Sequence, residues 1–100
     1  MASTCLTRMR LMANLRRLAR GQSCLIRTPV CNDDRETVVG CHYRLAGTSG
    51  MGIKPNDYAI AWGCARCHTY VDAHHDTETR LMHAEGVLRT LDKLVKLGEI

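Results

Sequence analysis

Aromatic residues are scarce in this sequence, and their scarcity limits what can fill a core. They make up 4% of the 100 residues, with no Phe, one Trp and three Tyr. Because aromatic side chains normally supply much of the buried area, we expect a thin, mainly aliphatic core. Ordering a chain of this length costs on the order of 100–200 kcal/mol in conformational entropy. The fold therefore needs a further source of stability, and the six cysteines are the obvious candidates.

Long apolar runs are also missing. No stretch approaches the roughly 20 apolar residues of a membrane-spanning helix. Arginines interrupt the N-terminus where a secretory signal would carry its apolar segment. The sequence therefore predicts a cytoplasmic protein without a membrane segment, and in that compartment cysteines bind metal more often than they form disulfides. Its length predicts a single domain over 14–100, preceded by an N-terminal extension over 1–13.

Acidic residues are absent from the first 32 positions, which contain six arginines and carry a charge of +6. The other 68 residues hold 8 basic and 10 acidic side chains, so the whole chain has a net charge of +4. A basic arm on a nearly neutral body suits a polyanionic partner such as nucleic acid. An ordinary solvated helix face would have the same composition.

The pattern of apolar residues and turn signals predicts an α+β domain of order α-β-β-α-α. The expected elements are a helix over 14–20 that stops at Gly21, an extended run over 24–27, a turn over 31–34, a strand over 37–43, a Gly-rich loop over 46–57, a strand over 58–63, a helix that begins at or just inside Cys64, and a last helix over 78–97.

The last helix has the clearest local signals. Thr77 is expected to cap its N-terminus, and Gly98 is expected to end it. Apolar residues at helical spacing predict its buried face, which comprises Leu81, Ala84, Leu88, Leu91 and Val95.

Cys64 and Cys67 form a Cys-x-x-Cys pair, which chelates a tetrahedral metal from a tight turn. A structural zinc needs a second pair, and Cys24 and Cys31 are the best candidates. Structural zinc contributes an apparent 10–16 kcal/mol in small peptides, enough to offset a thin core. A redox dithiol and a c-type haem attachment site, which has the form Cys-x-x-Cys-His, are the alternatives.

The histidines are candidates for a second site. His68 and Asp72 lie four residues apart on a predicted helix, so they can share a divalent cation or form a surface ion pair. His42 ends the first predicted strand. Its side chain can be a hydrogen-bonded structural group or a catalytic group. Three others have weaker claims, namely His74, His75 and His83.

Together these features resemble the HNH (ββα-metal) endonucleases, in which a strand ending in His, a loop and a second strand precede a helix. The chain is more closely similar to the small prophage-encoded YbcO-like nucleases, distant relatives of the RecA-dependent nuclease Ref. The resembling segments span about 14–98 and comprise Leu15-Arg16-Arg17-Leu18-Ala19-Arg20-Gly21 through Cys24, Cys31-Asn32, Glu36-Thr37, His42-Tyr43-Arg44-Leu45-Ala46-Gly47, Gly50-Met51-Gly52, Lys54-Pro55-x-Asp57, Cys64-x-x-Cys67-His68-x-x-x-Asp72 and His83-Ala84-Glu85-Gly86.

The resemblance implies a small HNH-like domain stapled by zinc, with flanking N-terminal and C-terminal helices. It implies that His42 is the general base and that His68 and Asp72 bind a catalytic divalent metal, Mg²⁺ or Mn²⁺. It also implies a structural Zn²⁺ on four cysteines, which match Cys24, Cys31, Cys64 and Cys67.

Two positions depart from the HNH pattern. Many HNH sites have a His or Asp ligand just before the base, where this chain has Cys41, and a thiolate is a poor ligand for Mg²⁺. Cys5 and Cys41 are otherwise expected to be buried free thiols. The middle Asn of HNH has no clear match, and Asp57 is the expected substitute that orients the base or the loop.

The predicted activity is metal-dependent hydrolysis of DNA phosphodiester bonds with little sequence specificity, in a phage or prophage context. Arg44 or Lys54 would neutralise the phosphate, while Arg16, Arg17 and Arg20 would grip the DNA backbone. A RecA-type filament is a candidate partner. The main alternative is a non-catalytic zinc module that binds DNA or a recombination protein, and a third is electron transfer through c-type haem.

Overall fold

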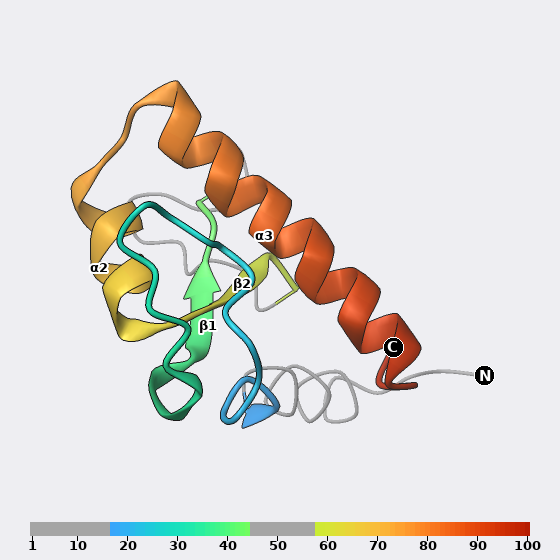
Figure 1. Ribbon diagram of the computed structural model, residues 1–100. Coiled ribbons are helices and arrows are strands. Elements are labelled where there is room, and N and C mark those ends of the chain that lie inside the picture. The colour runs from blue at the N-terminus through green and yellow to red at the C-terminus, as the bar shows by residue number, and fades with distance from the viewer. Residues whose placement is uncertain (1–16, 45–57) are drawn as a thin grey trace, which may run out of the picture.

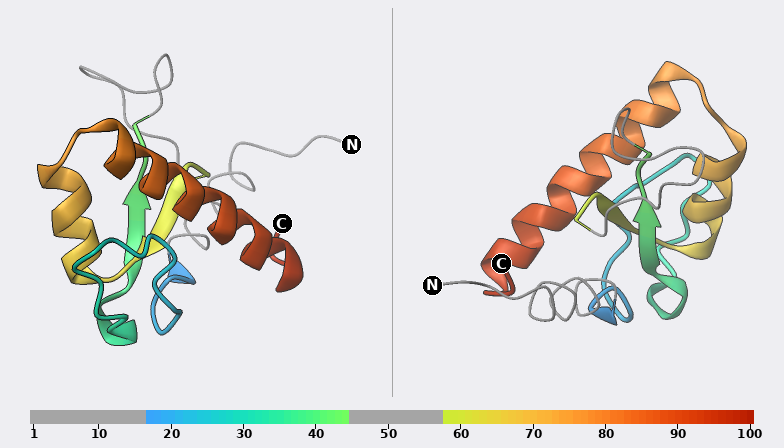
Figure 2. Two further views of the ribbon diagram at one scale, coloured as in Figure 1. Left: turned by 45° about the horizontal axis from the view of Figure 1, so that its top comes forward. Right: turned by 180° about the vertical axis from the view of Figure 1, so that it is seen from behind.

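The computed structural model describes residues 17–44 and 58–100 and shows a small α+β domain (Figure 1). Two strands form an antiparallel sheet in which Gly40 pairs with Trp62 and His42 pairs with Ile60. The long helix α3 lies across the sheet and contacts mainly β2, while α2 contacts both β2 and α3 (Figures 1 and 2). In chain order the elements are η1 (Arg35–Thr37, a 3-10 helix), β1 (Val39–His42), β2 (Ile60–Gly63), α2 (Ala65–Ala73) and α3 (Thr77–Lys96).

Both predicted strands are present but shorter than expected. The first begins at Val39 because the preceding residues form the 3-10 helix η1. Asp34 caps η1, and its side chain accepts a hydrogen bond from the Glu36 N–H at 3.2 Å. The Thr37 hydroxyl donates to the Asp34 carbonyl at 2.8 Å. These local hydrogen bonds satisfy backbone groups that a longer strand would have to pair.

The segment before η1 departs further from the sequence prediction. Residues 24–27 form no strand, although the Leu25 N–H donates to the Trp62 carbonyl at 2.7 Å. Arg27 has a positive φ of 61°, which turns the backbone out of an extended path. Residues 14–16 of the predicted helix over 14–20 lie outside the described residues, and in the described part Arg17 is helical while residues 18–20 form a turn. Its expected stop is confirmed, because Gly21 takes a left-handed φ of 83°.

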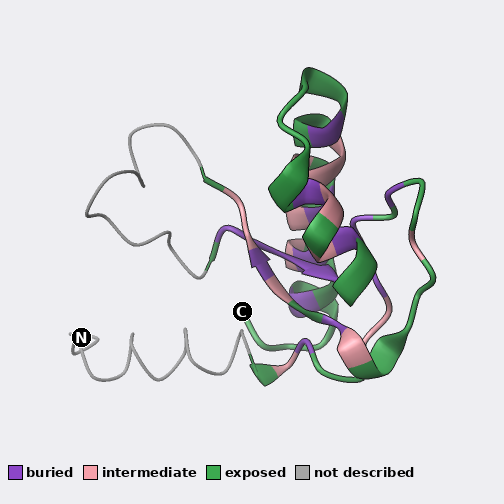
Figure 3. Cartoon of the chain, turned by 90° about the vertical axis from the view of Figure 1, so that its left-hand side faces the viewer, coloured by how far each residue is buried: buried purple, intermediate pink, exposed green. Residues whose placement is uncertain are grey.

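The core is thin, as its composition predicts. Its largest fully buried side chains are one tryptophan and four aliphatic residues, namely Trp62, Ile26, Ile60, Leu94 and Val38. β2 is buried along its whole length, whereas the outer faces of the helices are exposed (Figure 3). Packing is close at the end of β2, because a Cβ on Gly63 would lie 2.5 Å from the Ile26 Cδ1 atom.

The predicted buried face of α3 is wrong. Leu81, Leu88 and Val95 are 56%, 65% and 59% exposed. The helix instead packs through a different face, whose buried residues are Thr79, Gly86, Thr90 and Leu94. Small residues on this face let the helix approach the sheet closely, since a Cβ on Gly86 would lie 3.1 Å from the Ala61 Cβ.

The start of α3 also needs a correction. Asp76, not Thr77, is the N-cap, and its carboxylate accepts hydrogen bonds from the N–H and hydroxyl of Thr79 at 3.2 and 2.7 Å. At the other end, Gly98 takes a positive φ of 74° just after the C-cap Leu97, as predicted. Neither helix in the described part of the chain combines the length and the apolar character needed to cross a membrane.

Candidate metal centre and active site

Four cysteines converge at the N-terminus of α2. Cys64 is the N-cap of this helix and Cys67 lies in its first turn, while Cys24 and Cys31 come from the segment before η1. Their sulfur atoms lie within 4.8 Å of one another, and those of Cys31 and Cys64 are 4.0 Å apart. A tetrahedral zinc with bonds of about 2.3 Å places its sulfur ligands about 3.8 Å apart. The four side chains are therefore positioned to hold a metal ion, and the predicted second pair is confirmed.

Asp33 folds the segment between Cys24 and Cys31 back on itself. One of its oxygens accepts from the Cys24 N–H at 2.7 Å, and both lie within hydrogen-bond distance of the Ser23 hydroxyl. Its own backbone has a positive φ of 48°, which Asp tolerates better than most residues. The sequence prediction of a turn over 31–34 is thus confirmed, and this turn brings Cys31 towards Cys24.

The cysteine cluster is closed and supported by neighbouring donors. The Thr28 N–H donates to the Cys67 sulfur at 3.4 Å, and the Thr28 hydroxyl lies 3.1 Å from the same atom. Burial disfavours the Cys64 thiolate, but backbone hydrogen bonds at Cys67 and Asn32 outweigh this effect and lower its pKa to about 6. Burial raises the pKa of Cys67. Cys64 and Cys67 are fully buried among sulfur atoms, an arrangement that favours a structural metal over haem attachment.

His42 lies where two cavities meet. The first, of about 330 Å³, is also lined by groups from β1, α2 and α3, among them Arg44, Asp72, Arg80 and His83. The second, of about 510 Å³, runs beside β1 and is also lined by Arg17 and Arg20. The prediction that His42 ends the first strand is confirmed. Basic side chains thus flank this histidine on both sides, together with one carboxylate in each cavity, Asp72 in the first and Glu36 in the second.

Arg80 and His83 enter the first cavity from α3. The Arg80 guanidinium donates to the Tyr43 hydroxyl at 3.0 Å and lies 5.0 Å from the centre of its ring. The His83 ring meets Tyr43 edge-on at 5.2 Å, and its Nε2 lies 3.1 Å from the Cys41 carbonyl oxygen. Sequence reasoning missed Arg80 and ranked His83 low. Their spacing of three residues, which places both on one helix face, was the available signal.

A family model described as "Putative nuclease YbcO" matches residues 13–99. The chain belongs to this family. It is 41% identical over 97 residues to "Putative nuclease YbcO" of Escherichia coli (strain K12), with coverage of 89% of this chain and 98% of the relative. The same figures hold for "Putative nuclease ybcO" of Enterobacteria phage 82. The resemblance to the YbcO-like nucleases seen in the sequence motifs is therefore confirmed.

A solved structure is also similar to this YbcO-family chain. It is described as a putative bacteriophage protein from Escherichia coli str. K-12 substr. MG1655. The TM-score is 0.70 at 34% sequence identity, and the match covers 85% of this chain and all of the other. At this identity and coverage, the arrangement of helices and strands in the described residues is that of a related protein.

In this YbcO-family chain, Cys41 belongs to the core. It is 1% exposed, and its thiol donates to the Val39 carbonyl at 3.7 Å. Burial raises its pKa to about 12, so it is a neutral thiol at pH 7. Neighbouring strand residues point to opposite faces, and Cys41 and His42 are adjacent. The expectation of a buried free thiol at this position is confirmed. Cys5 lies outside the described residues.

His68 and Asp72 lie side by side on α2, as their spacing predicts. The His68 Nε2 atom is 3.4 Å from an Asp72 carboxylate oxygen, and the two side chains are 45% and 72% exposed. Within residues 17–44 and 58–100, only the four cysteines gather three or more possible metal ligands at close range. Three predicted site residues fall outside the described residues, namely Arg16, Lys54 and Asp57.

Proposed function

We propose that this chain is a metal-dependent DNA endonuclease of the HNH (ββα-metal) type with little sequence specificity. The observation that carries the proposal is the position of His42 between two cavities lined by basic groups. The family model and both relatives carry the name of a nuclease, which supports the same activity.

The two cavities suit a nucleic acid strand that passes over His42. Arg17 and Arg20 line the cavity on one side, and Arg44 and Arg80 line the cavity on the other. Phosphate contacts by arginine give affinity without reading sequence. No helix or loop among the described residues presents an obvious element for reading bases, which is why we propose low specificity. Arg16 and Lys54 are proposed to extend the same path.

His42 is proposed to act as the general base. A neutral imidazole nitrogen accepts a proton from the attacking water, and an ordinary imidazole suits this role near neutral pH. Arg44 and Arg80 would bind the phosphate oxygens and hold the scissile group against His42. Asp57 is proposed to orient the base or the loop that carries it.

His68 and Asp72 are proposed to hold the catalytic divalent cation, Mg²⁺ or Mn²⁺. Such a cation polarises the phosphate and stabilises the leaving oxygen. Mg²⁺ is usually held by one or two carboxylates together with water and substrate phosphates. His68 and Asp72 would supply two ligands, and water and the substrate phosphate would supply the others. Asp72 lines the same cavity as His42, so the cation and the base would act on one substrate.

The cysteine cluster is proposed to hold Zn²⁺ in a structural role. Four thiol ligands leave no open position for substrate, and three of them are buried. The metal would join the turn over 31–34 to the first turn of α2. That link fixes the helix on which His68 and Asp72 lie, so the structural site would position the catalytic one.

The test is cleavage of supercoiled plasmid and of single-stranded DNA by the purified zinc-loaded protein. Each reaction contains Mg²⁺ or Mn²⁺, with and without chelator and with and without RecA filaments. We expect metal-dependent nicking by the wild type and by Arg66→Gln, a variant on the exposed side of α2. We expect none from His68→Ala with Asp72→Ala. Folded, zinc-loaded protein that binds DNA but never cleaves it would favour the non-catalytic zinc module.

A further inference from the structure

The indole N–H of Trp62 is a buried donor without an acceptor. Within the described residues, Trp62 Nε1 is the one buried side-chain nitrogen or oxygen with no hydrogen-bond partner. The backbone of the same residue is satisfied, because its N–H donates to the Thr90 hydroxyl at 3.0 Å and its carbonyl accepts from Leu25. Such unpartnered groups are rare in folded proteins and call for an explanation.

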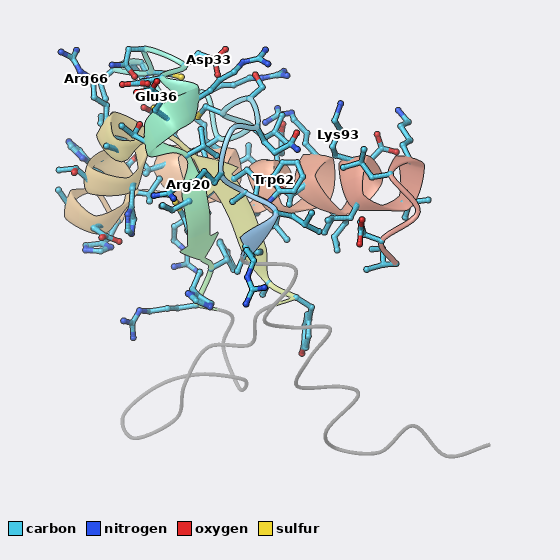
Figure 4. The ribbon with its side chains drawn as sticks, turned by 90° about the horizontal axis from the view of Figure 1, so that it is seen from below. Arg20, Asp33, Glu36, Trp62, Arg66 and Lys93 are labelled. Atoms are coloured by element: carbon cyan, nitrogen blue, oxygen red, sulfur yellow. The ribbon has the colours of Figure 1, made fainter. Side chains whose placement is uncertain are left out.

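Trp62 lines a small cavity that is rich in basic groups. The cavity measures about 240 Å³ and shares no lining residue with the two cavities at His42. Trp62 and Lys93 come from β2 and α3 and are labelled in Figure 4. The remaining polar lining residues are Gln22, Ser23 and Arg27, from the segment between Gly21 and η1, and Arg35, from η1 itself. Three separate parts of the fold thus bring cations to one place.

No acidic side chain lines this cavity. Asp33 lies near it, but its oxygens are engaged by the Cys24 N–H and the Ser23 hydroxyl. These hydrogen bonds, with smaller contributions from Arg35 and Arg27, lower the pKa of Asp33. Asp33 is therefore committed to the turn beside the cysteines. The positive charge of the cavity is therefore not balanced by a carboxylate among its lining residues.

We propose that this cavity binds an oxyanion of the phosphate class. The cationic side chains of Arg27, Arg35 and Lys93 would bind its oxygens through charge-assisted hydrogen bonds, beside the wall of the cavity to which Trp62 contributes. The cavity is smaller than the roughly 300–1,000 Å³ of typical small-molecule sites, which suits one phosphate group better than a whole nucleotide. A backbone phosphodiester of nucleic acid and free inorganic phosphate share this chemistry.

The single tryptophan gives a direct readout, because the chain has one indole N–H resonance. We would record this resonance in ¹⁵N-labelled zinc-loaded protein while adding sodium phosphate, sodium chloride at equal ionic strength, or a thymidine 12-mer without terminal phosphates. We expect phosphate to shift the resonance saturably and chloride to leave it in place. A shift with the oligonucleotide would identify backbone phosphodiesters as a source, and its absence would identify free phosphate.

Variants locate the site. Lys93→Gln and Arg35→Gln should each weaken phosphate binding about tenfold, as expected for loss of a charge-assisted hydrogen bond. Arg66→Gln, which removes an exposed charge outside this cavity, should leave binding unchanged. No shift with phosphate, equal shifts with chloride, or equal binding by all three variants would overturn the proposal. The readout needs no DNA cleavage, so it succeeds or fails independently of the nuclease activity.

Discussion

Cys41 and His42 are adjacent in β1 and have different surroundings. The Cys41 thiol is buried in the core, and His42 lines both cavities. The sequence alone places a cysteine where many HNH enzymes have a metal ligand, which argues against catalysis. The strand geometry buries the Cys41 thiol in the core, so this residue does not block the site, and any catalytic cation must be held by other groups.

Replacing Cys41 tests this assignment. Cys41→Ala should lower the free energy of unfolding by about 1–2 kcal/mol, since it removes a small buried group from a packed core. Zinc content and DNA cleavage should stay at wild-type levels. Urea denaturation, metal analysis and the plasmid assay measure these three quantities. A folded variant that keeps its zinc but loses cleavage would show that Cys41 takes part in the active site.

His83 should make stability depend on pH. Burial lowers its pKa below the ordinary value of 6.5, against the opposing effects of the Cys41 carbonyl and Asp72. The unfolded chain then binds the proton more readily than the folded one, so stability falls as pH drops below about 6.5 and is regained above it. His83→Gln should remove this part of the slope. Urea denaturation between about pH 5 and pH 7 with zinc present measures it, and identical slopes would contradict the account.

At the scale of elements, the sequence indicates what is local. The two strands, the start of α2 after Cys64, and the glycines that follow the N-terminal turn and α3 all depend on nearby residues. Cys24 and Cys31 were the best candidates for the second pair of ligands that a structural zinc needs, although the gap between them is longer than the usual spacing in zinc fingers. The 3-10 helix η1 was missed because the β-branched residues from Thr37 onward predicted a strand. Asp34 was therefore interpreted as part of a turn and not as a helix cap.

The buried face of α3 could not be found from apolar spacing, because small residues that let the helix pack closely against the sheet determine which face is buried. Gly86 and Thr90 face the sheet, where the Thr90 hydroxyl donates to the Gly86 carbonyl at 2.7 Å and accepts from the Trp62 N–H. A pattern search counts neither residue as apolar. Arg80 and His83 were misjudged for the same reason, since their role depends on which face of α3 meets β1.

Two leucines on α3 provide a matched test of this packing. Leu94 is 1% exposed and Leu88 is 65% exposed. Leu94→Ala should cost about 2–5 kcal/mol of stability through lost burial and a cavity. Leu88→Ala makes the same chemical change at the surface and should cost less than about 0.5 kcal/mol. Chemical denaturation of both variants measures the difference. Equal losses would mean that the exposed stripe is packed against something in solution.

At the scale of the whole molecule, we propose that a zinc ion on the four cysteines compensates for the thin core. Structural zinc contributes an apparent 10–16 kcal/mol in small peptides, comparable to the total stability of most domains. We expect one zinc per chain and loss of helical circular dichroism when a strong chelator removes it. Cys67→Ser should unfold in the same way, whereas Cys41→Ala should keep its zinc. An apo-protein with unchanged Tm would contradict the structural role.

The central claim is that His42 acts as the general base in cleaving a DNA strand, which the basic side chains around His42 bind. Its most direct test measures single-turnover cleavage and DNA affinity for the wild type and His42→Ala under the same conditions. The account predicts that cleavage falls at least about 100-fold, as expected for loss of a general base, while affinity changes less than twofold. Unchanged cleavage, or a loss of affinity large enough to explain the loss of cleavage, would contradict it.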